Sequence, residues 1–227
     1  MTVAERVAAV RERIARAAER AGRDPAGVRL VAVSKTFGAD AVLEAARAGV
    51  TDFGENRAQE LRHKAAAVGD AVTWHFVGHL QSNKVRAVVG VARVVHSVDR
   101  PGLAEALARR ARSVGVVQDV LVEVNVAAEA SKHGCEPPAA PALADEIASY
   151  DELALRGVMA IPPLAPDPEA SRPHFRALAA LRDEIAVRHP GAVDLSMGMS
   201  GDFEVAIEEG ATIVRVGEAI FGPRTSA

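Results

Sequence analysis

Short apolar runs alternate along this chain with longer stretches in which apolar and charged residues recur at helical spacing. Residues 3–21 place apolar side chains at positions 3, 7, 10, 14 and 17–18 and stop at Gly22, which predicts an N-terminal helix. From residue 30 onward, β-branched and aromatic residues gather in short runs that favour strands. These runs cover residues 30–33, 51–53, 73–77, 94–98, 117–126, 153–161, 193–197 and 212–216.

Stretches rich in Ala, Glu and Arg separate the strand-like runs. They predict helices at residues 39–48, 57–68, 83–89, 101–113, 138–149, 169–188 and 202–209. Regular alternation of this kind implies parallel strands joined by right-handed crossovers. We therefore expect an α/β fold: a single (β/α)8 TIM barrel with an extra N-terminal helix, forming one domain over residues 1–227. A doubly wound open sheet is the alternative, disfavoured because no Gly-rich dinucleotide turn follows the first run.

Composition narrows the functional classes. The net charge of −3 argues against nucleic-acid binding, and no apolar stretch reaches the roughly 18 residues of a membrane span. The amino-terminal segment has no apolar core after a basic start, so we expect no signal peptide. Cys135 is the single cysteine and cannot form an internal disulfide. A cytoplasmic protein without membrane or nucleic-acid partners is the expectation.

Lysine is scarce, since only four lysines stand beside twenty-three arginines. Lys35 directly follows the first strand-like run. A lysine at the carboxyl end of a buried strand can lose its proton and attack a carbonyl, which an arginine cannot do. Because active sites of barrels lie at the carboxyl ends of the strands, Lys35 is a candidate for a Schiff base with an aldehyde or ketone.

A turn of small residues after the seventh run, Met-Gly-Met-Ser-Gly-Asp at 197–202, suits a phosphate. Its backbone N–H groups and the following helix favour a dianion, and Ser200 adds a hydroxyl. Gly217, after the eighth run, allows a second backbone approach. The alternative is that Ser200 only caps the helix that follows it.

A phosphate site facing a Schiff-base lysine suggests pyridoxal 5′-phosphate, which carries both an aldehyde and a phosphate. Arg215, at the end of the eighth run, could face the pyridine nitrogen. A cation there would keep the ring unprotonated and weaken the electron sink that drives carbanion chemistry. The alternative for Arg215 is a salt bridge to a neighbouring carboxylate such as Glu55.

The remaining candidate residues give weaker evidence for a function. His75 and His79 are four residues apart, but no cysteine or carboxylate cluster joins them, so we expect no metal site. Lys84 and Lys132 remain lysines in an arginine-rich chain. Either could contact a second anion or the cofactor at the rim, or be a solvated surface residue, and their roles stay open.

Several segments together resemble the pyridoxal phosphate homeostasis protein family, in order and in spacing, over nearly the whole chain. The segments are AVSKT at 32–36, FGEN at 53–56, HFVGHLQSNK at 75–84, VN at 124–125, SKHG at 131–134, RGVMAI at 156–161, LSMGMS at 195–200 and VRVGEAIFG at 214–222. The resemblance implies a fold-type III barrel related to the N-terminal domain of alanine racemase.

The resemblance also implies roles for individual residues. Lys35 would form the imine, Arg215 would face the pyridine nitrogen, and the remaining cofactor-binding residues would be Asn56, His79, Met197, Ser200 and Gly217. Glu218 stands where relatives often carry a hydroxyl residue. A carboxylate repels a phosphate dianion, so we expect Glu218 to contribute only its backbone N–H.

The function implied is storage or delivery of pyridoxal phosphate in vitamin B6 homeostasis, by a monomer without robust catalytic activity. Apo-enzymes that use the cofactor are possible recipients. A weak amino-acid racemase is the alternative, although Tyr150, the only tyrosine, is poorly placed to act as the second base. A lysine aldolase acting on a sugar phosphate is a third reading of the same layout. The sequence does not identify the recipients or say whether delivery needs contact.

Overall fold

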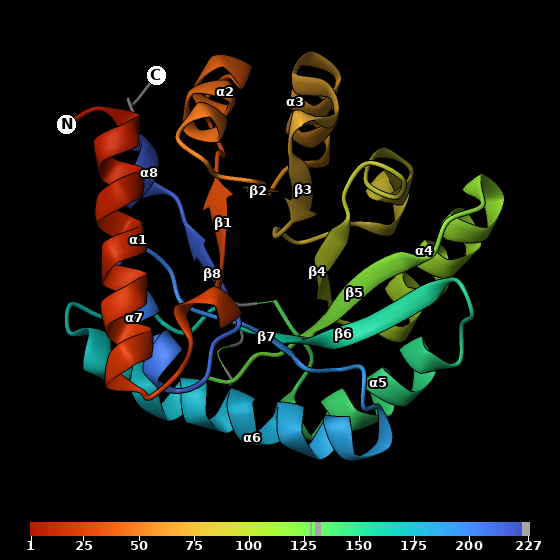
Figure 1. Cartoon of the computed structure of the whole chain (residues 1–227). Coiled ribbons are helices and arrows are strands. Elements are labelled where there is room, and N and C mark those ends of the chain that lie inside the picture. Colours follow the sequence, from red (N-terminus) through yellow and green to blue (C-terminus); the bar gives the residue numbers. More distant parts are fainter. Residues whose placement is uncertain (128, 130–132, 224–227) are drawn as a thin grey trace.

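The computed structural model of the chain describes residues 1–127, 129 and 133–223. Eight parallel strands close into a barrel in sequence order, and the first strand pairs with the eighth (Figure 1). The strands are β1 (Arg29–Val33), β2 (Asp52–Glu55), β3 (Thr73–Phe76), β4 (Val94–Val98), β5 (Gln118–Glu123), β6 (Leu153–Met159), β7 (Asp194–Ser196) and β8 (Ile213–Val216). The barrel expected from the strand–helix alternation is confirmed.

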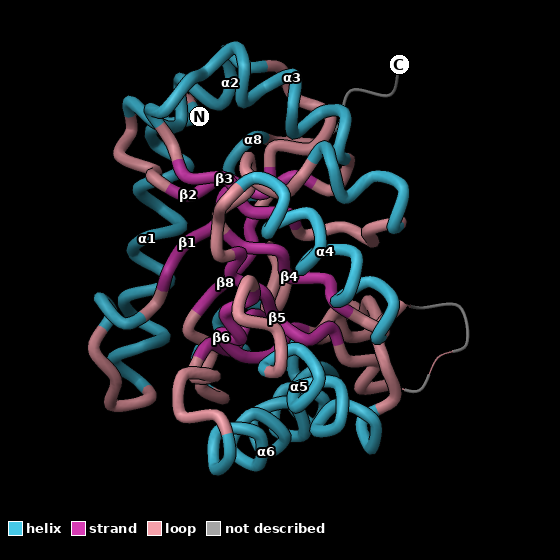
Figure 2. Tube along the Cα trace, turned by 90° about the vertical axis from the view of Figure 1, so that its right-hand side faces the viewer, coloured by secondary structure: helices cyan, strands magenta, loops and turns pink. Residues whose placement is uncertain are grey.

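Helices surround the barrel, with the strands in the interior of the molecule (Figure 2). They are α1 (Val3–Arg20), α2 (Ala39–Arg47), α3 (Ala58–Val68), α4 (Pro101–Val114), α5 (Ala140–Ala148), α6 (Arg172–Arg188), α7 (Phe203–Glu208) and α8 (Glu218–Phe221). Short 3-10 helices are η1 (Pro25–Gly27), η2 (Gly69–Ala71), η3 (Ser82–Ala87), η4 (Pro137–Ala139) and η5 (Pro168–Ser171). Among the described residues, no helix combines the length and apolar character needed to cross a membrane.

The structure differs from the prediction at two short elements. The α-helix expected at 83–89 is the 3-10 helix η3, which is followed by Gly90 in the left-handed region (φ +85°). A segment this short and rich in valine cannot offset the cost of starting an α-helix. The one-turn helix α8 was not predicted, because four residues carry too little periodicity to detect.

The extra N-terminal helix is held by local and long-range contacts. Thr2 and Glu5 form a reciprocal capping box at its start. Its apolar side buries Val7, Val10 and Ile14. The helix packs against α7, α8 and α2, so it closes the side of the barrel where the surrounding helices are shortest.

The core has two parts. A large apolar cluster fills the space between the barrel and the helices. Inside the barrel a smaller cluster is formed by Val31, Val94, Leu121, Met159 and Ile213. Because side chains alternate between the two faces of a strand, the positions two residues along from these also face inward, and several of those are polar.

Candidate functional site

The carboxyl ends of the strands meet at one end of the barrel, called the mouth below. Most residues predicted for the site follow these ends: Lys35 after β1, Asn56 after β2, His79 after β3, Ser200 after β7, and Gly217 after β8. Arg215 belongs to β8 itself. The closed barrel therefore brings to one rim residues that lie up to 182 positions apart in the sequence, from Lys35 to Gly217.

Lys35 lies in a tight turn at the mouth. The N–H of Phe37 donates to the carbonyl of Ser34 at 3.0 Å, and Lys35 is partly exposed between them. Thr36 has a φ of +73° and is the only non-glycine residue with positive φ among those described. This conformation is costly for a β-branched residue, so the surrounding contacts impose it. One such contact is the hydrogen bond from the Thr36 N–H to Glu60 Oε2, at 3.2 Å.

A buried ion pair ties the ends of β1 and β2 to α3 beside this turn. Lys64 Nζ lies 2.5 Å from Glu55 Oε1 and donates to the Ser34 carbonyl at 2.7 Å. The Ser34 hydroxyl donates to the same Glu55 oxygen at 2.6 Å. Burial raises the pKa of Glu55, and the bonds from Lys64 and Ser34 offset part of that rise. The suggested Arg215–Glu55 salt bridge is therefore wrong, since Glu55 pairs with Lys64.

Ser200 and Gly217 join the loops after β7 and β8. The Ala219 N–H, in α8, donates to Ser200 Oγ at 3.3 Å. The suggestion that Ser200 caps the helix directly after it is wrong, because the N-cap of α7 is Asp202. A Cβ at Gly217 would lie 3.1 Å from the Val33 carbonyl, a tight contact, so glycine eases the close approach of the chain to β1. The pair offers a hydroxyl and backbone N–H groups, which suit a phosphate.

Arg215 is fixed inside the barrel just below the mouth. Its Nη1 donates to Ser196 Oγ at 2.7 Å and its Nη2 to the Ala160 carbonyl at 3.0 Å. Burial lowers the pKa of Arg215 to about 10, and the charges of Glu123 and Asp202 act in the opposite direction. This cation faces the interior from β8, which fits the role expected of it.

A line of buried hydrogen bonds continues from Arg215 across the barrel. Ser196 Oγ lies 2.9 Å from His96 Nδ1, His96 Nε2 lies 2.9 Å from His75 Nδ1, and His75 Nε2 lies 3.0 Å from Asp52 Oδ1. The sequence singled out His75 only as a possible metal ligand and assigned no role to His96. Their positions on β3 and β4 could have suggested inward-facing partners, but not their contact.

Glu123, at the end of β5, was also missed. Its side chain is buried, and its Oε2 has no hydrogen-bond partner among the described residues. Burial and the nearby charge of Asp99 raise the pKa of Glu123 to about 7, with Arg215 opposing them. The expected strand at 117–126 extended past this position, which hid the fact that a carboxyl group ends the strand at the mouth.

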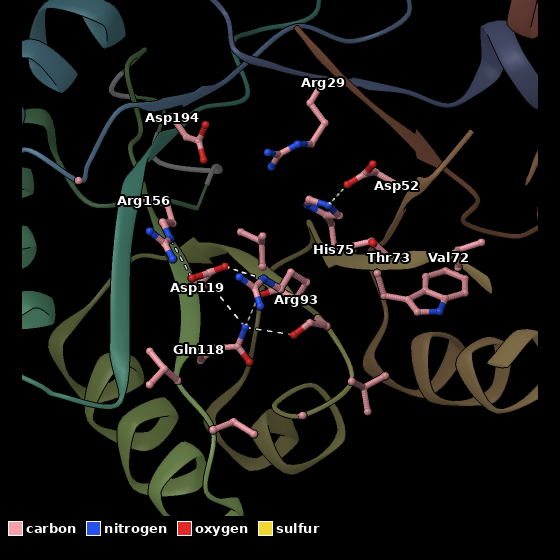
Figure 3. Close-up of a pocket in the computed structure, with 18 of the residues that line it drawn as sticks. Arg29, Asp52, Val72, Thr73, His75, Arg93, Gln118, Asp119, Arg156 and Asp194 are labelled. Atoms are coloured by element: carbon pink, nitrogen blue, oxygen red, sulfur yellow. Dashed lines mark hydrogen bonds and ion pairs between the residues drawn. The ribbon is translucent and has the colours of Figure 1, made fainter. Parts of the chain in front are cut away.

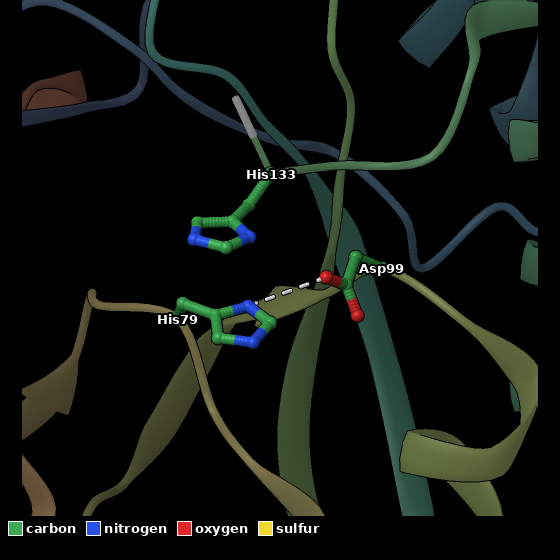
Figure 4. A group of neighbouring side chains, drawn as sticks. All are labelled: His79, Asp99 and His133. Carbon is green, nitrogen blue, oxygen red and sulfur yellow. Dashed lines mark ion pairs between the residues drawn. The ribbon is translucent and has the colours of Figure 1, made fainter. Parts of the chain in front are cut away.

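His79 lies beside Asp99 and His133 at the mouth (Figure 4). His79 Nδ1 is 3.4 Å from Asp99 Oδ2, and the two imidazole rings stack with centroids 3.8 Å apart and planes at 13°. One nitrogen or oxygen of each residue lies within 4.8 Å of the others, as a metal site would require. However, nearly parallel rings aim their in-plane lone pairs into separate planes, so one ion could not bind both rings as they lie. Burial and His133 lower the pKa of His79, while Asp99 acts against them.

The other predicted residues are placed as follows. Asn56 is partly exposed, and its backbone packs so closely on Gly78 that a Cβ there would lie 2.2 Å from the Asn56 carbonyl. Met197 is fully buried and belongs to the apolar cluster between barrel and helices. Glu218 is exposed at the start of α8, and Lys84 is exposed in η3. Lys132 lies outside the described residues.

The opposite end of the barrel, the floor, has a hollow of about 920 Å³ (Figure 3). Its charged residues are largely paired with one another: Asp119 accepts from Arg93 and from Arg156, each at 2.8 Å. Asp52, the last residue of the buried line of hydrogen bonds, forms part of its wall. Since barrels carry chemistry at the mouth, pairing at the floor serves stability.

Comparisons with known proteins show the family and agree with the fold. The family model described as "Alanine racemase, N-terminal domain" matches residues 6–225. A protein of Pseudomonas aeruginosa named "Pyridoxal phosphate homeostasis protein" is 49% identical over 98% of this chain and 96% of its own length. One of the same name from Aquifex aeolicus is 45% identical over 99% of both chains.

Solved structures give the same picture. PipY of Synechococcus elongatus, solved with PLP bound, is 35% identical, covers 97% of this chain and all of its own (100%), and superposes with a TM-score of 0.85. Alanine racemase of Clostridium difficile reaches a TM-score of 0.72 at 14% identity, covering 95% of this chain and 56% of its own. At that identity the likeness concerns the fold alone.

Proposed function

The chain belongs to the family of pyridoxal phosphate homeostasis proteins, and we propose that it binds pyridoxal 5′-phosphate at the mouth and holds it for intracellular vitamin B6 homeostasis. The observation that carries this proposal is the hydrogen bond between Ser200 and the start of α8, together with the hydrogen-bonded, buried Arg215. These contacts support the proposal because a hydroxyl suited to a phosphate and a buried cation lie near the rim that also bears Lys35. The relative solved with PLP bound supports the same ligand.

The residues present fit this cofactor. Lys35 supplies the amine for covalent attachment, Ser200 and the backbone at Gly217 bind the phosphate, and Arg215 faces the ring nitrogen. When bound, the cofactor supplies an aldehyde that condenses with an amine and a ring that absorbs visible light. Asn56, His79 and Met197 complete the proposed set, Met197 through its place in the turn after β7.

The same residues favour a protein that holds the cofactor over one that uses it in catalysis. A racemase of this fold needs a second proton-transfer group opposite the lysine. Tyr150 directly follows α5 and precedes β6, so it lies towards the floor rather than the mouth. The Arg215 cation also weakens the electron sink of the ring. A carrier without robust catalysis, monomeric and handing the cofactor to apo-enzymes, is therefore the function we propose.

The test is the ultraviolet–visible spectrum of the purified protein before and after borohydride. We expect a visible absorption band that borohydride removes, with the reduced cofactor located on Lys35 by peptide mass spectrometry. Lys35→Ala should lose the band, whereas exposed Lys84→Ala is the control and should keep it. A colourless protein that binds sugar phosphates would support an aldolase, and alanine racemisation at ordinary enzyme rates of about 10 per second would support the racemase.

A further inference from the structure

A second hollow lies on the outer wall of the barrel, between α3 and α4. The connection from β3 to β4 is the short η3, which packs against both α3 and α4 but does not fill the layer as a full helix would. The space left has a volume of about 740 Å³. None of the residues named for the cofactor in the family resemblance lines it.

The charged residues lining this outer hollow are all cations. They are Arg62 of α3, Lys84 and Arg86 of η3, and Arg110 of α4, and no aspartate or glutamate lines the space. The chain as a whole has a net charge of −3, so a pocket whose charged lining residues are all basic is not a consequence of composition. Cations gathered without counter-charges repel one another and attract anions.

Neighbouring basic residues on the same helices are paired, in contrast to those that line the hollow. On α4, Arg109 bonds Glu105 at 3.0 Å and Arg112 bonds Glu152 at 2.5 Å. Arg110, which lies between them in sequence, is the one that lines the hollow. On α3, Lys64 is paired within the protein. The carboxylates of these three pairs thus bind cations that do not line the hollow.

The cations of the hollow also lack partners of their own. The side chains of Arg62, Lys84 and Arg86 line the hollow without a hydrogen bond or ion pair to any residue that the structure describes. Arg110 Nη1 donates to Ser113 Oγ at 3.2 Å, but its Nε is buried without a partner in the described chain. Leaving a buried donor unpaired is unfavourable, so this N–H is suited to an acceptor.

The remaining wall is apolar. It includes Val89, Val91 and Val114, and Val114 is 38% exposed. Gly90 lies in the same wall, in the left-handed region with a φ of +85°. A ligand that fits both the cationic and the apolar part of the lining carries an anionic group at one end and an apolar ring at the other.

We propose that this outer hollow binds a small organic phosphate, with the dianion held by Arg62, Arg86 and Arg110 and an apolar ring against the valines. Guanidinium groups match the geometry of phosphate oxygens and bind them in pairs of hydrogen bonds. Lys84 adds a mobile charge at the entrance. The site is independent of the mouth. It gives Lys84, one of the four scarce lysines of the sequence, a role in recognising an anion.

Titration of the full chain with phenyl phosphate, followed by ¹H–¹⁵N NMR, tests the proposal. We expect shifts at the amides of η3 and α4 and at the Arg110 Nε–H, saturating at millimolar concentration. Inorganic phosphate should bind about tenfold more weakly, because it lacks the ring that covers the valines. Added salt should weaken both ligands.

The matched variants are Arg110→Gln and Arg109→Gln, adjacent on one helix. Arg110→Gln should weaken phenyl phosphate about fivefold, the effect of one half-exposed cation, while Arg109→Gln should bind as the unmodified protein does. Equal effects of the two variants would show non-specific attraction and overturn the proposal. So would the absence of any saturable shift, or shifts confined to residues 217–219, which would place the ligand at the mouth.

Discussion

His75 Nδ1 lies 2.9 Å from His96 Nε2, and both rings are fully buried inside the barrel. Two imidazoles can share such a contact only if one ring donates and the other accepts. The outer partners decide which does which. His96 Nδ1 meets the Ser196 hydroxyl, and His75 Nε2 meets the Asp52 carboxylate.

Arg215 favours one order of donors from the mouth end. A guanidinium can only donate, so Ser196 accepts from it and keeps its own hydrogen available for His96 Nδ1. His96 then donates from Nε2 to His75, and His75 donates from Nε2 to Asp52. In this order each ring donates from Nε2. The line of bonds thus runs from a buried cation near the mouth to a carboxylate at the floor.

This arrangement makes stability depend on pH. Burial, followed by the charges of His75 and Arg215, holds the pKa of His96 well below its ordinary value of 6.5. Below that pH the unfolded chain binds a proton at His96 that the folded chain cannot accept, so the free energy of unfolding falls as pH falls. We expect this one group to contribute a slope of up to about 1.4 kcal/mol per pH unit.

Urea unfolding of the wild-type protein and of His96→Gln between pH 8 and pH 5, a range spanning the ordinary histidine value, measures that contribution. The variant should be less stable at the upper end but should lose less stability on acidification. His63→Gln, at an exposed position on α3, is the control and should keep the wild-type slope. If the free energies of unfolding of wild type and His96→Gln changed in parallel with pH, this would contradict the lowered pKa of His96.

The Lys64–Glu55 pair predicts a second stability effect. Lys64→Met would leave Glu55 buried without its cation and the Ser34 carbonyl without its donor. We expect a loss of about 3–5 kcal/mol in the free energy of unfolding, which is typical when one partner of a buried pair is removed. Calorimetric or denaturant unfolding measures it.

Two further variants separate pairing from lost packing. Lys84→Met removes an exposed lysine and should change stability by no more than about 0.5 kcal/mol. The double variant Lys64→Met with Glu55→Gln should be more stable than Lys64→Met alone, because the unpaired charge is gone. If the double variant were the less stable one, the loss would come from packing rather than from charge.

The sequence predicted what depends on repetition and chain order. Alternating strands and helices sufficed for the barrel, and the rule that function follows strand ends brought Lys35, Ser200 and Gly217 to one rim. The sequence alone did not determine to which side of the sheet each strand residue points. The second strand was expected at 51–53 and spans Asp52–Glu55, and the facing of Glu55 decides whether it meets Arg215 or Lys64.

Long-range polar contacts were beyond sequence reasoning for the same reason. Ser196 and His96 are 100 residues apart and meet only because β4 and β7 both point these side chains into the barrel. Lys64 left a weak signal, since it is a scarce lysine three residues after buried Leu61 on the helix face that packs on the barrel. Its partner could not be inferred until the exact end of β2 was known.

Thr36 predicts a gain in stability. Its φ of +73° is unfavourable for a β-branched residue but natural for glycine. We expect Thr36→Gly to raise the free energy of unfolding by about 1 kcal/mol, the relief of strain being partly offset by the entropy of the unfolded chain. Thr36→Ala retains a Cβ in the same conformation and should gain much less. Equal gains from both variants would place the effect in the threonine side chain rather than in φ.

Ser200 offers the sharpest test of the mouth. Its hydroxyl accepts from the Ala219 N–H at 3.3 Å and keeps its own hydrogen to donate. If that hydrogen binds the cofactor phosphate, Ser200→Ala should raise the cofactor's dissociation rate about tenfold, as loss of a hydrogen bond to a charged group does, and leave the visible band in place because Lys35 is untouched. Ser97→Ala is a matched control, since that buried hydroxyl has no hydrogen-bond partner among the described residues.

A merely structural Ser200 would give the opposite pattern, in which the variant loses thermal stability through α8 while the dissociation rate of the cofactor stays that of the wild type. Stopped-flow transfer of the cofactor to an apo-enzyme, alongside thermal unfolding of the same preparations, therefore separates phosphate binding from capping.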